Sequence, residues 1–160
     1  MRKKLLIMAV VVGISALFIT AGIYAGTKVP DVIKMENKAY KKHTKSIMMF
    51  SHKKHIEEYK AGCGECHHDD KGKPLNNLKE GDNVQNCIEC HKELGRTPGK
   101  TKKEWKAKNV SKKEQKKMKL EWHAEAIHFN CIDCHKKFNK KTGTKKAPYT
   151  CAKCHPKKKK

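Results

Sequence analysis

The sequence predicts a small, mainly α-helical domain with long loops and little or no sheet, organised around something other than apolar side chains. Three observations indicate this. After Ala25, Leu, Ile, Val and Phe make up 17 of 135 residues, which is typical of a disordered chain unless another material fills the interior. The formal net charge is +22, from 38 Lys and Arg against 16 Asp and Glu. The eight cysteines are regularly spaced, and strand signals are nearly absent. A conventional enzyme with a large apolar core is therefore excluded.

The first 25 residues have the layout of an export signal. A basic start at Arg2–Lys4 is followed by an apolar run from Leu5 to Ile19 and then by small residues. We expect residues 1–25 to be a signal peptide or an uncleaved anchor, because the apolar stretch approaches the about 20 residues that a spanning helix needs. Both interpretations place the rest of the chain outside the cytoplasm and predict a periplasmic location.

All eight cysteines lie in four C-x-x-C pairs, and a histidine follows each pair at once. The pairs are Cys63 and Cys66, Cys87 and Cys90, Cys131 and Cys134, and Cys151 and Cys154, and the histidines are His67, His91, His135 and His155. C-x-x-C-H is the attachment signature of c-type haem, because thiols at this spacing reach both vinyl groups of one porphyrin and the next residue offers its imidazole to the iron. Thiolate zinc sites and disulfides do not need the histidines. We therefore expect four covalently attached haems and an unfolded apoprotein.

Six histidines remain beyond these four: His43, His52, His55, His68, His123 and His128. His52 and His55 stand at i and i+3, so on one helical turn they share a face, and each can reach a different haem. His68 directly follows the first motif, and its side chain can serve a neighbouring haem. An excess of histidine in a chain with so few core residues favours ligation of iron by histidine on both sides.

The order F-x-H-x-x-H, then C-x-x-C-H-H, then three further haem motifs resembles the class III multihaem cytochromes c, the low-potential tetrahaem carriers of sulfate-reducing bacteria. The resemblance covers roughly residues 47–156 and implies bis-histidine ligation at every iron. It implies that His52, His68 and His55 close the haems of the first, second and third motifs, respectively.

For the fourth motif the resemblance implies a histidine upstream of the third, and we choose His128 over His123. His43 lies outside the pattern and is expected at the surface. The chain departs from some members because all four motifs are short and because the link from Lys92 to Asn130 is long.

The remaining segments are expected to be simple. Residues 26–46 are interpreted as an extended lead-in, residues 47–156 as the tetrahaem domain and residues 157–160 as a basic tail. A capping box at Ser111 predicts a helix from Lys112 to about Ile127. Its apolar stripe, which is expected to pack on a haem face, consists of Met118, Trp122 and Ala126.

The resemblance implies an electron-transfer protein rather than an enzyme, a soluble periplasmic carrier in anaerobic respiration with sulfate reduction. It implies hydrogenase or formate dehydrogenase as donor and a membrane redox complex as acceptor. The lysines favour acidic redox partners or peripheral contact with an anionic membrane surface, and the compartment disfavours nucleic acid. The alternatives are an anchored quinol-oxidising tetrahaem protein and a small multihaem reductase with one open iron.

Overall fold

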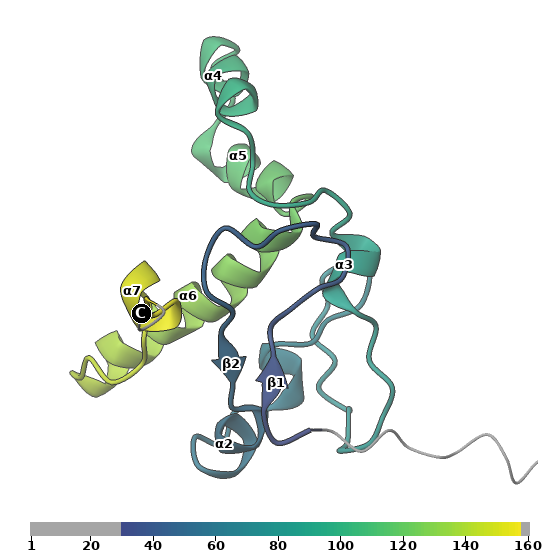
Figure 1. The fold of residues 1–160 in the computed structure, drawn as a ribbon, viewed down its shortest axis with the longest axis vertical. Coiled ribbons are helices and arrows are strands. Elements are labelled where there is room, and N and C mark those ends of the chain that lie inside the picture. The colour runs from purple at the N-terminus through teal and green to yellow at the C-terminus, as the bar shows by residue number, and fades with distance from the viewer. Residues whose placement is uncertain (1–29, 158–160) are drawn as a thin grey trace, which may run out of the picture. The chain divides into compact units, whose positions relative to one another are not determined.

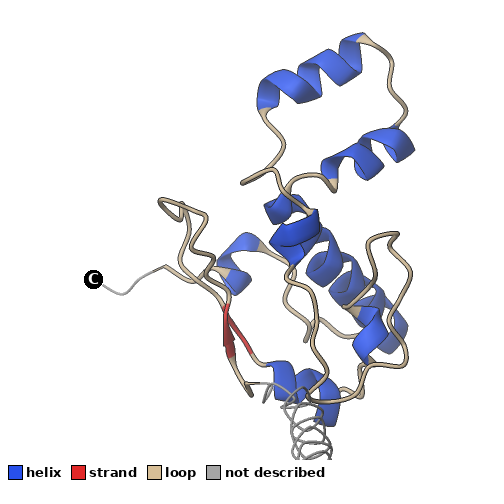
Figure 2. Ribbon diagram, turned by 90° about the vertical axis from the view of Figure 1, so that its right-hand side faces the viewer, coloured by secondary structure: helices blue, strands red, loops and turns tan. Residues whose placement is uncertain are grey.

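The structure is a computed structural model that describes residues 30–157. The expected export signal and the last three residues of the basic tail lie outside the described residues. The elements are β1 (Ile33–Lys34), β2 (Met49–Phe50), α2 (His52–Glu57), the 3-10 turn η1 (Cys63–Glu65), α3 (Cys87–Cys90), α4 (Gly99–Ala107), α5 (Lys112–Lys119), α6 (His123–Thr142) and α7 (Cys151–Cys154). Short helices joined by long loops, with one small sheet within residues 30–157, confirm the expected fold class (Figure 2).

The small sheet joins the lead-in segment to the chain that enters α2. β1 and β2 are antiparallel, with Ile33 opposite Phe50 and Lys34 opposite Met49 (Figure 1). The backbone N–H of Met35 donates to the carbonyl of Met48 at 2.9 Å and extends the pairing by one residue. The segment before α2 is thus held in place by main-chain hydrogen bonds.

The chain divides into two compact units. One comprises Pro30–Lys79 and Val84–Lys160 and contains every helix and strand named above. The described part of the other is Glu80–Asn83, a turn in which Gly81 has a φ of +94°. This backbone region favours glycine because a Cβ would be strained there.

The predicted continuous helix from Lys112 to Ile127 is wrong, because the chain forms two helices there. Helix α5 begins as expected, and the side-chain oxygen of Ser111 accepts a hydrogen bond from the backbone N–H of Glu114 at 3.2 Å. It ends at Lys119, and Trp122 is extended, with φ −86° and ψ 119°. The reason is a short parallel bridge between Glu93 and Trp122, which draws the backbone of residues 121–123 out of helical geometry.

The described residues contain almost no apolar core. Ala126 is the one hydrophobic residue among them that is buried, whereas Thr97, His123, Glu125 and Asn139 are buried polar residues. Apolar side chains alone therefore do not hold this fold together. No helix within residues 30–157 is both long enough and apolar enough to cross a membrane.

Candidate functional site

Each C-x-x-C-H motif lies on a helical turn. The first, second and fourth motifs form η1, α3 and α7, and the third lies within α6. In the three short turns the backbone N–H of the histidine donates to the carbonyl of the first cysteine: His67 to Cys63 at 2.8 Å, His91 to Cys87 at 2.9 Å and His155 to Cys151 at 2.7 Å. This i to i−4 bond is that of an α-helical turn, and it brings the two thiols and the imidazole together.

Local sequence explains two of these turns. At the start of α3 the backbone N–H of Asn86 donates to the carboxylate of Glu89 at 3.3 Å, which satisfies one otherwise unpaired donor at the helix end. In η1, a Cβ atom on Gly64 would lie 3.0 Å from the backbone nitrogen of Asn76. Glycine therefore lets the loop after the first motif approach the turn closely.

No disulfide joins any of the eight cysteines, so both thiols of every pair are available for attachment. For five cysteines burial is the main cause of a raised pKa, and it raises the pKa of Cys131 to about 11. The other four are Cys66, Cys87, Cys134 and Cys154. Within residues 30–157 no three His, Cys, Asp or Glu side chains converge where they could hold a lone metal ion, so the C-x-x-C pairs stay separate.

The structure pairs each motif histidine with a second histidine from elsewhere in the chain. The ring centres are 6.4 Å apart for His52 and His67, 5.8 Å for His68 and His91, 6.1 Å for His55 and His135, and 6.1 Å for His128 and His155. The first three are the combinations that the family resemblance implies, and the fourth is the one chosen with His128 over His123. All eight predicted ligand residues are thus brought together in pairs, each beside its own cysteines.

The spacing of these rings fits the group that the motifs imply. An imidazole nitrogen lies about 2.0 Å from a first-row metal that it binds and about 1.2 Å from its own ring centre, so two imidazoles on opposite sides of one ion have centres about 6.4 Å apart. The observed range of 5.8–6.4 Å agrees with this value. Direct hydrogen bonding between two imidazoles would not produce four such gaps, each beside a C-x-x-C pair.

Hydrogen bonds at Nδ1 prepare most of these imidazoles to bind a metal through Nε2. Five Nδ1 atoms lie within hydrogen-bond distance of a main-chain carbonyl: His55 with Ser51, His68 with Asp69, His91 with Leu120, His135 with Pro148 and His155 with Ser46. A carbonyl only accepts, so Nδ1 carries the proton, and the lone pair is at Nε2. Burial lowers the pKa of His67 and His128, which favours the neutral, ligating form.

His123 has a different environment from His128. The hydroxyl of Tyr40 lies 2.9 Å from Nδ1 of His123 and accepts a hydrogen bond from the backbone N–H of Gly95. His123 is buried and holds the segment before β2 against α6. His128, by contrast, faces His155, with ring centres 6.1 Å apart. The geometry therefore favours His128 at the fourth motif.

His43, expected at the surface, is half-buried. Its ring centre lies 5.2 Å from that of Tyr40, and its Nε2 atom is buried without a hydrogen-bond partner. The sequence gives no signal for this contact, because it depends on Tyr40 packing against both His43 and the distant His123. Three of the carbonyls that accept hydrogen bonds from Nδ1 atoms were also not predictable. Leu120, Pro148 and Ser46 are distant in sequence from the histidines that they contact.

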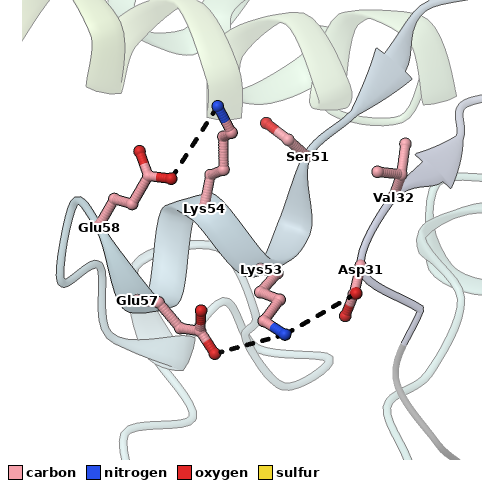
Figure 3. A pocket seen from close by; sticks show the side chains of 7 residues that line it. All are labelled: Asp31, Val32, Ser51, Lys53, Lys54, Glu57 and Glu58. Carbon is pink, nitrogen blue, oxygen red and sulfur yellow. Dashed lines mark ion pairs between the residues drawn. The ribbon is translucent and has the colours of Figure 1, made fainter.

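Helix α2 presents His52 and His55 from one turn, as their spacing predicts. On another face of the helix, Lys53 lies between Asp31 and Glu57, at 3.8 Å from each carboxylate, and Lys54 lies 3.9 Å from Glu58 (Figure 3). Together with Val32 and Ser51, these residues line an open pocket of about 310 Å³ between α2 and the segment that enters β1. The ion pairs are exposed and long, so they contribute little to stability, and nothing at this pocket indicates a binding site.

The sequence was compared with the models of known protein families. The model of a family described as the Class III cytochrome C family matches residues 29–155, a range that contains all four motifs and all eight paired histidines. No curated protein and no solved structure matches the chain.

Proposed function

The chain belongs to the class III cytochrome c family, and on that premise we propose that it is a periplasmic tetrahaem carrier of low-potential electrons. The family makes it a multihaem electron-transfer protein with covalently bound haem. We further propose that it binds four haems, that the paired histidines are the iron ligands and that its partners are acidic redox proteins. The observation that carries it is the set of four histidine pairs, each beside its own pair of cysteines.

The proposal gives each paired residue a role. The cysteines of a motif would hold one porphyrin through thioether bonds, and the motif histidine and its partner would be the protein ligands of its iron. When bound, haem supplies reversible one-electron chemistry between ferric and ferrous iron. Histidine on both sides, with no methionine, favours a low reduction potential. For the five imidazoles that have one, the Nδ1 hydrogen bond to a carbonyl increases basicity and would favour the ferric state further.

The ring pairs favour a carrier over a reductase. If both imidazoles of each pair bind the iron, no coordination position would remain for a substrate. A reductase would need one motif histidine without an opposing ring, and every motif histidine has one. The anchored quinol-oxidising alternative depends on residues 1–25, and the 38 residues from Ala25 to Gly62 separate that segment from the first motif.

The partners are proposed from charge and from the family. The strongly basic chain suits acidic redox proteins, because opposite charges speed and orient a brief encounter. We propose hydrogenase or formate dehydrogenase as electron donor and a membrane redox complex as acceptor. Anionic lipid headgroups are a second class of surface that the same lysines can contact.

Reductive titration tests the proposed function. The purified protein is titrated anaerobically with a stoichiometric reductant while its visible spectrum and solution potential are recorded. We expect about four electrons per chain, taken up reversibly and with overlapping steps, at negative midpoint potentials throughout. A positive midpoint for any haem, or uptake of fewer electrons than attached haems, would contradict the proposal.

A further inference from the structure

A lysine-rich segment separates the second motif from the third and contains none of the paired residues. We define residues 96–120 as the basic arm, which includes α4 and α5. It holds eleven Lys and Arg against two acidic residues, Glu104 and Glu114, and no Cys or His. Its charge is therefore not explained by haem attachment or ligation. In both ribbon views α4 and α5 lie beyond the N-terminal end of α6 (Figures 1 and 2).

Most lysines of the basic arm have no acidic partner within the protein. Among the described residues, Lys102 pairs with Glu125 and Lys116 pairs with Asp133. The other eight form no ion pair within residues 30–157: Lys100, Lys103, Lys106, Lys108, Lys112, Lys113, Lys117 and Lys119. A dense set of unneutralised positive charges on two helices is costly through self-repulsion, and an acidic partner would relieve that cost.

The base of the arm is firmly attached to α6. Arg96 donates two hydrogen bonds to the carboxylate of Glu125, at 3.0 and 3.3 Å, and the side chain of Glu125 is 2% exposed. Burial raises the pKa of Glu125, but the hydrogen bond and charge of Arg96, together with Lys102, outweigh it and keep that pKa below its usual value. Trp105 of α4 packs edge-to-face on Trp122, with ring centres 5.9 Å apart. The arm is thus a fixed element and not a loose loop.

The same base contacts the second motif directly. The carbonyl of Leu120, at the end of the arm, accepts the hydrogen bond from Nδ1 of His91. Beside it, the backbone N–H of Glu93 donates to the carbonyl of Glu121 at 3.0 Å, and that of His123 donates to the carbonyl of Glu93 at 2.8 Å. The arm therefore ends next to the imidazole of the second motif, and the backbone just beyond it is hydrogen-bonded to the segment that follows that motif.

We propose that the basic arm is a docking surface for an acidic redox protein and that it brings this partner to the haem position of Cys87, Cys90 and His91. This inference rests on the proposed electron-carrier function. It adds the surface on which the partner binds and the haem position through which electrons are exchanged. The partner would carry carboxylates around its own redox centre. Contacts of this kind are small and polar, so binding should be weak, rapid and strongly reduced by salt.

The chain supplies a matched control for the test. The arm variant replaces Lys103, Lys106, Lys113 and Lys117 with glutamine, and the control variant replaces Lys137, Lys140, Lys141 and Lys145 with glutamine. Both lose four positive charges, so the overall field falls equally and only the location differs. All eight lysines are exposed, and none belongs to an ion pair within residues 30–157. Glutamine keeps a good helix propensity, and an unchanged haem content and visible spectrum would show that each variant is intact.

The probe is oxidised flavodoxin, a small acidic flavin protein, added to the haem-loaded full chain. Binding is measured at low ionic strength by titration calorimetry and by NMR, from the changes in backbone amide chemical shifts of the haem-loaded chain. We expect the arm variant to bind at least about tenfold more weakly and the control less than about threefold more weakly. The wild-type shifts should centre on α4, α5 and the residues around His91, and the difference between the variants should vanish at high salt.

Three outcomes would overturn the proposal. If both variants lose affinity equally, the overall charge and not the arm attracts the partner. If the control loses more, the C-terminal lysines are the docking surface. If the arm is needed for binding to phosphatidylserine vesicles but not for binding to flavodoxin, the arm is a membrane contact. None of these results changes the haem count or the reductive titration, so failure of this inference is distinct from failure of the proposed function.

Discussion

Replacing His128 with alanine is expected to open one iron of the reduced protein to carbon monoxide. The ring of His128 faces that of His155, with centres 6.1 Å apart, and no other histidine ring within residues 30–157 pairs with His155. Without the imidazole one coordination position is empty, and the iron loses the ligand that keeps it low-spin. We expect a carbon monoxide-induced change in the Soret band that corresponds to about one haem in four. Wild-type protein should show no such change.

The matched control is His123→Ala. His123 is buried beside Tyr40 and is the other histidine upstream of the third motif. This variant loses a hydrogen bond and should lose about 1 kcal/mol of stability, but its irons should stay closed to carbon monoxide. The assignment would be wrong if the gas bound to the His123 variant and not to the His128 variant. Haem content measured per chain separates loss of a ligand from loss of a cofactor.

The second large effect is the loss of the fold without haem. Ala126 is the one buried hydrophobic residue among the described residues, so burial of side chains cannot offset the conformational entropy of about 130 ordered residues. Residues 26–160, produced in a cytoplasm that lacks the attachment machinery, should have the circular dichroism of an unfolded chain. They should show no cooperative thermal transition and be digested by trypsin within minutes, whereas the haem-loaded protein should resist trypsin and melt cooperatively.

An apoprotein that unfolds in one cooperative transition would contradict this expectation. The comparison needs both forms under the same reducing conditions, because eight free thiols can form disulfides and stabilise a non-native state. Circular dichroism at several urea concentrations would distinguish residual helix from a folded domain, since residual helix in α4 or α6 decays gradually.

The sequence predicts the haem chemistry of this protein better than its helices. The cysteines and the histidine that follows each pair are local patterns, so the attachment motifs and their histidines can be read without a structure, whereas the helical turns η1, α3 and α7 that carry three of them were not predicted. The pairs His52–His67, His68–His91 and His55–His135 depend on long-range folding, and they were accessible only through the family resemblance. Each of these pairs is present in the structure, as is His128–His155.

What could not be predicted depends on contacts between distant backbone segments. The helix expected across Leu120 is interrupted because Glu93 forms a bridge there and His91 takes the carbonyl of Leu120. A helical pattern of apolar residues does not reveal that a loop thirty residues earlier will compete for that backbone. Glu125 was missed for a similar reason, since a buried carboxylate is stable only where Arg96 and Lys102 happen to reach it.

The most direct test of the central claim, that four irons are each closed by two histidines, is a single spectroscopic measurement on the purified wild-type protein. Haem is quantified per chain, and the visible spectrum of the reduced form is recorded before and after addition of carbon monoxide. The account predicts about four haems per chain, all low-spin and all unaffected by the gas. A carbon monoxide-induced change in any substantial fraction of the haem, or fewer than four haems per intact chain, would contradict it.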